Sequence, residues 1–252
     1  MNKREMERAW VEIDLRALKG NAAHLRRIMQ PGCKLIAVVK ADAYGHGAVE
    51  VAKTLNLIGV DTFAVATIEE GITLRRHKIA GEILILGYTA PGRAADLQRF
   101  RLRQTVVDMA HAEALNAMGI PLEVEIKVDT GMHRLGIDVQ NVHEIEKVYE
   151  MNCLKICGIY SHLCVSDGTT DFAFLSTDSK IGGEKNQDSV YASAKQLRTF
   201  ELSTTVVRLC AGGNCIIWYI VSEDGQSPQG GFIVSGHGDK IQDYVCPRAE
   251  SR

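Results

Sequence analysis

Lys40 lies at a position in the sequence where its side-chain amine could take part in catalysis. Lys40 directly follows the apolar run 35–39, and Gly45 and Gly47 come shortly after it. Five consecutive apolar residues are typical of a strand that is covered on both faces of a parallel sheet. An amine at the end of such a strand can, when neutral, form a Schiff base with an aldehyde. For an isolated Val-Val-Lys, a solvated lysine that ends the strand is the more common alternative.

A helix follows this lysine. Apolar residues recur at helical spacing after Gly47, at Ala48, Val51, Ala52 and Leu55. The order strand, lysine, loop, helix is that of one unit of a parallel α/β protein. In such proteins the active-site groups lie at the carboxyl ends of the strands, which is where Lys40 would lie.

The rest of the first 163 residues repeats this strand and helix order. We expect a half-exposed strand at 10–15 and further strands at 62–66, 83–86, 104–108, 122–129 and 154–163. We expect helices at 15–29, 67–76, 91–100, 109–118 and 141–151. A capping box of Thr67 and Glu70 opens one helix, and Asp108 caps another. Strands alternating with helices predict a parallel α/β barrel or a doubly wound sheet, and periodicity does not choose between them.

Length and charge limit which domain organisation and which binding partners the chain can have. A chain of 252 residues can form one large α/β domain, or a domain with a small appendage. Its 29 Lys and Arg nearly balance its 31 Asp and Glu. The net charge therefore creates no strong positive potential that would favour binding to nucleic acid or to an anionic membrane. The charged start lacks an apolar signal region, and the longest apolar run, 215–221, is too short to span a bilayer. We expect a cytoplasmic protein with neither a nucleic-acid nor a membrane partner.

The cysteines do not have the number or spacing of a disulfide framework or a zinc site. Their number, seven, is odd, and no Cys-x-x-Cys occurs, which disfavours disulfides and a zinc ribbon. Cys153, Cys157 and Cys164 lie near His162 in the sequence, but buried, reduced thiols explain these cysteines better than a metal site. We therefore expect no metal.

Three segments resemble the alanine racemases, which are pyridoxal-phosphate enzymes. Residues 37–47, AVVKADAYGHG, closely resemble the family's cofactor-attachment signature. Residues 127–136, KVDTGMHRLG, resemble its second signature, and residues 158–163, GIYSHL, a strand that ends in a histidine. The resemblance covers residues 10–172 and implies a (β/α)8 TIM-type barrel with pyridoxal 5′-phosphate at its mouth.

The resemblance also implies a role for each matched residue. Lys40 would bind the cofactor and carry a proton, and Tyr44 would bind the phosphate. Arg134 would hold the substrate carboxylate or the phenolic oxygen of the cofactor, and His162 would stack on the pyridine ring. Lys127 matches a lysine that some members carry in carbamylated form, and a plain lysine is equally allowed. Without the resemblance, Arg134 would be a surface residue and His162 a structural one.

The resemblance ends near residue 172. Residues 173–252 form a divergent tail of uncertain fold, in which we expect a hairpin of strands 204–209 and 215–221. The family's C-terminal β domain, whose tyrosine is the second proton carrier, is not recognisable. Neither Tyr219 nor Tyr244 stands in a similar context, and Arg208 is not assigned to the site. We favour a truncated or frame-shifted racemase with an incomplete barrel over a short relative whose tail closes the barrel.

The expected function is the interconversion of L- and D-alanine, which in this family supplies D-alanine for peptidoglycan. Complete members act as homodimers on small amino-acid substrates, and without the second proton carrier this chain would be a weak racemase. One alternative is a serine racemase of the same family. Another is a single barrel that binds pyridoxal phosphate without catalysis, and a decarboxylase on the same barrel is a more distant option.

Overall fold

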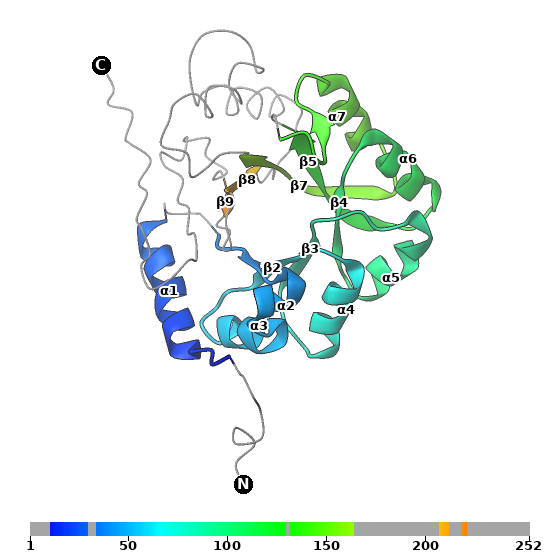
Figure 1. The fold of residues 1–252 in the computed structure, drawn as a ribbon. Coiled ribbons are helices and arrows are strands. Elements are labelled where there is room, and N and C mark those ends of the chain that lie inside the picture. Colours follow the sequence, from blue (N-terminus) through cyan, green and yellow to red (C-terminus); the bar gives the residue numbers. More distant parts are fainter. Residues whose placement is uncertain (1–10, 30–33, 130–131, 164–206, 212–217, 221–252) are drawn as a thin grey trace, which may run out of the picture.

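The computed structural model describes residues 11–29, 34–129, 132–163, 207–211 and 218–220, and its strands form one sheet. The strands are β1 (Ala37–Val38), β2 (Thr62–Val65), β3 (Glu82–Ile85), β4 (Arg103–Val106), β5 (Leu122–Asp129), β6 (Ile137–Asp138), β7 (Leu154–Leu163), β8 (Val207–Ala211) and β9 (Trp218–Ile220). The order is β1-β2-β3-β4-β5-β7-β8-β9, with β6 beside β5. Neighbours are parallel except β8 and β9. Figure 1 shows that the sheet curves, with helices around its outside.

Helices connect these strands in the expected order. They are α1 (Leu15–Ile28), α2 (Lys40–Gly45), α3 (Ala48–Asn56), α4 (Ile68–Arg76), α5 (Ala94–Arg99), α6 (Met109–Ala117) and α7 (Val142–Tyr149), with a 3₁₀ turn at Pro91–Arg93 before α5. Short connections between alternating strands and helices allow each helix to cover its neighbouring strands. The predicted parallel α/β order is confirmed.

Side chains of the strands divide into two buried groups. Phe63, Val65 and Ile85 belong to the core that packs beneath the helices, whereas Ala64 and Leu84 belong to a second cluster with Tyr160. The division follows from the strand geometry, because successive side chains point to opposite faces of a sheet. The second cluster therefore fills the inside of the curve, where Tyr44 packs against it.

Two of the predicted helix starts are present. Thr67 and Glu70 form the capping box of α4. The Asp108 side chain accepts a 2.7 Å hydrogen bond from the His111 N–H at the start of α6. Each cap satisfies a backbone donor that has no partner within the helix.

The predicted strand at 10–15 is wrong. Residues 11–14 carry no regular structure, and α1 begins at Leu15. The Asp14 carboxylate accepts hydrogen bonds from the N–H groups of Arg16 at 2.8 Å and Ala17 at 3.2 Å. Alternating apolar and polar residues predict a strand here, but the Asp14 side chain caps α1 instead.

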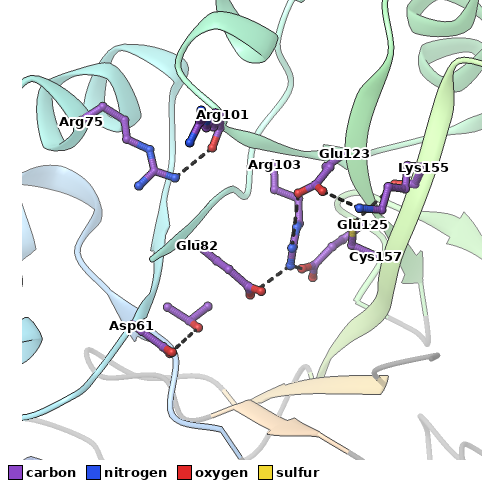
Figure 2. A network of polar contacts seen from close by, with 10 residues as sticks. Asp61, Arg75, Glu82, Arg101, Arg103, Glu123, Glu125, Lys155 and Cys157 are labelled. Carbon is purple, nitrogen blue, oxygen red and sulfur yellow. Dashed lines mark hydrogen bonds and ion pairs between the residues drawn. The ribbon is translucent and has the colours of Figure 1, made fainter. Parts of the chain in front are cut away.

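An ion-pair network with a buried centre joins the beginnings of three strands (Figure 2). Arg103, at the start of β4, donates to Glu82 of β3 at 3.1 Å and to Glu125 of β5 at 3.0 Å. Glu123 lies 3.5 Å from the same guanidinium and also pairs with Lys155 at 2.8 Å. Because strand beginnings meet at one end of a parallel sheet, this network lies at the end opposite to Lys40.

The hairpin predicted in the tail is present in part. β8 lies parallel to β7, and β9 returns antiparallel to β8 with Tyr219 opposite Leu209. Residues 173–206 and Tyr244 lie outside the described residues, as does Cys164. Cys153 and Cys157 are free thiols, half-buried. Within the part of the chain that the structure describes, no helix combines the length and apolarity needed to cross a membrane.

Candidate active site

Lys40 begins a short turn of the opposite hand to an ordinary helix. Ala41, Asp42, Ala43 and Tyr44 have φ between 51° and 56° and ψ between 37° and 48°. The left-handed conformation costs an L-residue roughly 1–2 kcal/mol, and a run of four such residues is rare. Strained backbone of this kind persists only where the surroundings fix it, and it concentrates at functional sites. The sequence predicted a loop here, so the hand of the turn is a finding of the structure.

Hydrogen bonds from three directions hold this turn. The Ala41 N–H donates to Glu70 Oε1 of α4 at 2.7 Å. The Ala43 N–H donates to the Val39 carbonyl at 3.0 Å, which ties the turn to the end of β1. Asp42 Oδ1 accepts from the Ala48 N–H at 2.7 Å and so joins the turn to the start of α3. The turn is fixed to β1, α3 and α4, and it presents Lys40 and Tyr44 together, with Lys40 Nζ 6.0 Å from the Tyr44 ring centre.

His162 lies near the end of β7 and feels the charges of three cationic side chains. Its burial, and then the positive charges of Arg134, Lys127 and Lys40, lower the pKa of His162 to about 4. The imidazole is therefore neutral at physiological pH. The four residues come from the ends of β1, β5 and β7 and from the loop after β5, so the structure brings together residues far apart in the sequence.

Lys127 points into the same interior. Its side chain is buried, and Nζ donates to the carbonyls of Val128 at 2.7 Å and Leu135 at 3.3 Å. Nζ also lies 5.9 Å from the ring centre of Tyr160, whose hydroxyl is 2.8 Å from Thr105 Oγ1. This lysine therefore connects the inside of the sheet to the loop that carries Arg134.

The Arg134 loop is tied back to β5. The Asp129 carboxylate accepts two hydrogen bonds from His133. The His133 backbone N–H donates at 3.0 Å, and its ring Nδ1 donates at 2.9 Å. Gly136 has φ of +119°, and a Cβ there would lie 2.8 Å from the Asp129 nitrogen. Its N–H donates to the Val107 carbonyl at 2.7 Å. Glycine is required because the loop passes so close to the β5 backbone.

The sequence predicted a site of Lys40, Tyr44, Lys127, Arg134 and His162, and the structure places these residues near the carboxyl ends of β1, β5 and β7. The sequence did not predict the residues that hydrogen-bond to the Lys40 turn. The signal for Glu70 was visible as half of a capping box, but that motif says nothing of a second partner. Asp42 gave no such signal, because its bond to Ala48 depends on the unusual backbone between them.

Comparison with known proteins decides the family. The family model described as the N-terminal domain of alanine racemase matches residues 13–217. The chain belongs to this family. Two curated racemases, both from enterococci, are among its relatives.

The amino-acid racemase of Enterococcus faecalis is 44% identical over 178 residues, which are 71% of this chain and 25% of the relative. The serine/alanine racemase of Enterococcus gallinarum is 42% identical over 176 residues, 70% of this chain and 25% of the relative. The chain thus spans about a quarter of the length of these curated relatives.

A solved alanine racemase of Clostridium difficile 630 has the same fold. Its TM-score is 0.68 at 30% identity, over 79% of this chain and 51% of that one. The curved parallel sheet with outer helices is therefore the TIM-type barrel of the alanine racemase family. Among the described residues, side chains from alternate strand positions pack together on its inner face, as in other barrels of this type.

The donor set fits the anionic cofactor that the alanine racemase family implies. Lys40, Lys127 and Arg134 all act on one neutral imidazole. Three positive charges that act on one neutral ring favour a bound anion, such as a phosphate with a phenolic oxygen. Lys40 supplies the amine, and the ring of Tyr44, whose hydroxyl can donate, lies 6.0 Å from it.

Proposed function

We propose that this chain is the cofactor-binding part of a pyridoxal-phosphate-dependent amino-acid racemase that acts on alanine. The observation that carries the proposal is the placement of Lys40. It heads a strained left-handed turn, and its charge acts together with those of Arg134 and Lys127 on the neutral His162. The names of the relatives support the same activity.

Four residues would hold the cofactor. Lys40 would bind its aldehyde carbon, and the Tyr44 hydroxyl would donate to its phosphate. His162 would lie against the ring as a neutral imidazole and so would not add a fourth positive charge. Arg134 would bind its phenolic oxygen or the substrate carboxylate, since a flat guanidinium suits either. When bound, the cofactor withdraws electrons from the substrate and makes the α-proton acidic.

Lys40 would then move the proton. Once the substrate amine has displaced it, Nζ can take the α-proton on one face of the substrate and return it. The left-handed turn fixes the backbone that follows Lys40, and so the point from which Nζ would reach the substrate.

Lys127 would position Arg134. Its Nζ donates to the Leu135 carbonyl, next to Arg134 in the loop. We propose this role for the plain lysine, and the carbamylated form stays a prediction. A carbamate keeps only one N–H on Nζ and adds acceptor oxygens, so it could donate to only one of the Val128 and Leu135 carbonyls.

Serine is the second candidate substrate. A relative named serine/alanine racemase, 42% identical to this chain, favours it. A pocket discriminates between a methyl and a hydroxymethyl group by only ~1–3 kcal/mol of binding free energy, unless buried polar groups are left unpaired. We also propose, from family membership, a homodimeric active form and a role in supplying D-alanine for peptidoglycan.

The test is to incubate the chain with pyridoxal phosphate and L-alanine or L-serine in deuterated water. Lys40 acting on one face predicts deuterium at the α-carbon, and inversion reports a proton carrier on each face. Lys40→Ala should abolish both signals, whereas Lys53→Ala, at an exposed pair with Glu50, should abolish neither. No exchange with either amino acid would contradict a racemase and favour a non-catalytic cofactor-binding barrel. Release of carbon dioxide would instead indicate a decarboxylase.

A further inference from the structure

The Glu70 carboxylate joins two loops at the mouth of the barrel. Oε1 accepts a 2.7 Å hydrogen bond from the N–H of Ala41, the residue after Lys40. Oε2 accepts from the N–H groups of Ala66 at 2.7 Å and Thr67 at 3.3 Å. One carboxylate therefore connects the turn after β1 to the loop after β2.

We infer that Glu70 is a positioning residue for Lys40, acting through the Ala41 peptide. This inference rests on the proposed function, in which Lys40 binds the cofactor. Ala41 is the first of the four left-handed residues, so its peptide sets the direction in which the chain leaves Lys40. A hydrogen bond to a carboxylate is stronger than one to a neutral acceptor, which suits a contact that must hold strained backbone.

The helix cap alone does not account for this arrangement. In the capping box, the Glu70 N–H donates to Thr67 Oγ1 at 3.3 Å, and Glu70 Oε2 accepts from the Thr67 N–H. Both bonds are complete without Oε1. The bond from Ala41 reaches across 29 positions in the sequence, and it serves the Lys40 turn rather than α4.

Two variants separate the two roles. In Glu70→Gln the side chain keeps one acceptor oxygen. Because Oε2 accepts two N–H groups and Oε1 only one, we expect this oxygen to stay with Ala66 and Thr67 and the NH₂ to face Ala41. Thr67→Ala removes the hydroxyl half of the capping box but leaves the Ala41 contact in place. Glu69→Gln is a charge control on the same helix, because Glu69 is exposed and pairs with Arg93.

The first measurement uses the cofactor-free chain. Amide hydrogen exchange at Ala41 reports the Glu70 contact directly, and we expect it to be about tenfold faster in Glu70→Gln. Thr67→Ala and Glu69→Gln should leave this rate unchanged. Equal exchange at Ala41 in all the variants and the wild type would overturn the inference.

The second measurement is the rate at which Lys40 captures pyridoxal phosphate, read as the borohydride-trapped adduct. We expect capture to be about tenfold slower in Glu70→Gln than in Thr67→Ala at equal folded fraction. Equal capture rates in the two variants would overturn a positioning role. If the wild-type chain captures no cofactor, the proposed function fails, and the exchange result alone decides whether Glu70 holds the turn.

Discussion

Arg103 donates to the fully buried carboxylate of Glu125 at 3.0 Å, between β4 and β5 at the end of the sheet opposite to Lys40 (Figure 2). Burial by itself would lower the pKa of Arg103, but the charges of Glu125 and Glu82 outweigh it and raise that pKa. The two carboxylates thus stabilise the charged guanidinium, and each of them accepts a hydrogen bond from it.

Breaking this pair should destabilise the fold. Glu125→Leu leaves the Arg103 charge buried with fewer partners, and we expect a loss of ~3–5 kcal/mol in the free energy of unfolding. Glu123→Gln, at a side chain 48% exposed, should cost no more than ~1 kcal/mol. Urea unfolding of the three chains measures both. Similar losses in the two variants would show that burial of the pair does not determine its contribution.

His162 should stay neutral to low pH. Its pKa of about 4 in the folded protein lies below the 6.5 of an unperturbed histidine. As the pH falls through 6.5 the unfolded chain takes up this proton first, so stability is lost between pH 6.5 and about 4. His162→Gln should remove that part of the slope, measured as the free energy of unfolding against pH. Burial also lowers the pKa of His111, so His111 adds a pH dependence of the same sign to the free energy of unfolding. The wild type and His162→Gln both retain this contribution.

The surrounding cations can be tested on the same histidine. Because the Arg134 charge lowers the pKa of His162, Arg134→Leu should raise that pKa, as followed by NMR titration of the ring. An unchanged titration would mean that Arg134 does not face His162, and the site as described would be wrong.

Gly136 should not tolerate a side chain. In Gly136→Ala the new Cβ meets the β5 backbone at 2.8–2.9 Å, at a φ that L-residues rarely adopt. We expect a loss of roughly 1–3 kcal/mol in the free energy of unfolding. Gly92→Ala is the matched control, since a Cβ there has nothing within 4 Å. If thermal unfolding does not distinguish the two variants, the close passage of the loop over β5 is wrong.

The sequence predicted much of this fold because its signals are local. The bounds of β5 and β7 agree with those expected, and Thr67 and Asp108 cap the helices assigned to them. Each of these features depends on residues within one element.

The rest depends on contacts between elements. Nothing in Ala-Asp-Ala-Tyr sets the sign of φ, so the left-handed turn comes from its partners in β1, α3 and α4. Arg103 meets Glu125 only because β4 and β5 adopt one register, and β5 shifts its register against β7 between Val124 and Glu125. Sequence periodicity does not specify register across strands.

Borohydride reduction of the chain after incubation with pyridoxal phosphate, followed by peptide mapping, tests the central claim most directly. The account predicts one stable adduct, on Lys40, that is lost in Lys40→Ala and retained in Lys53→Ala. An adduct spread over exposed lysines, or a wild-type chain that shows none on Lys40, would contradict it.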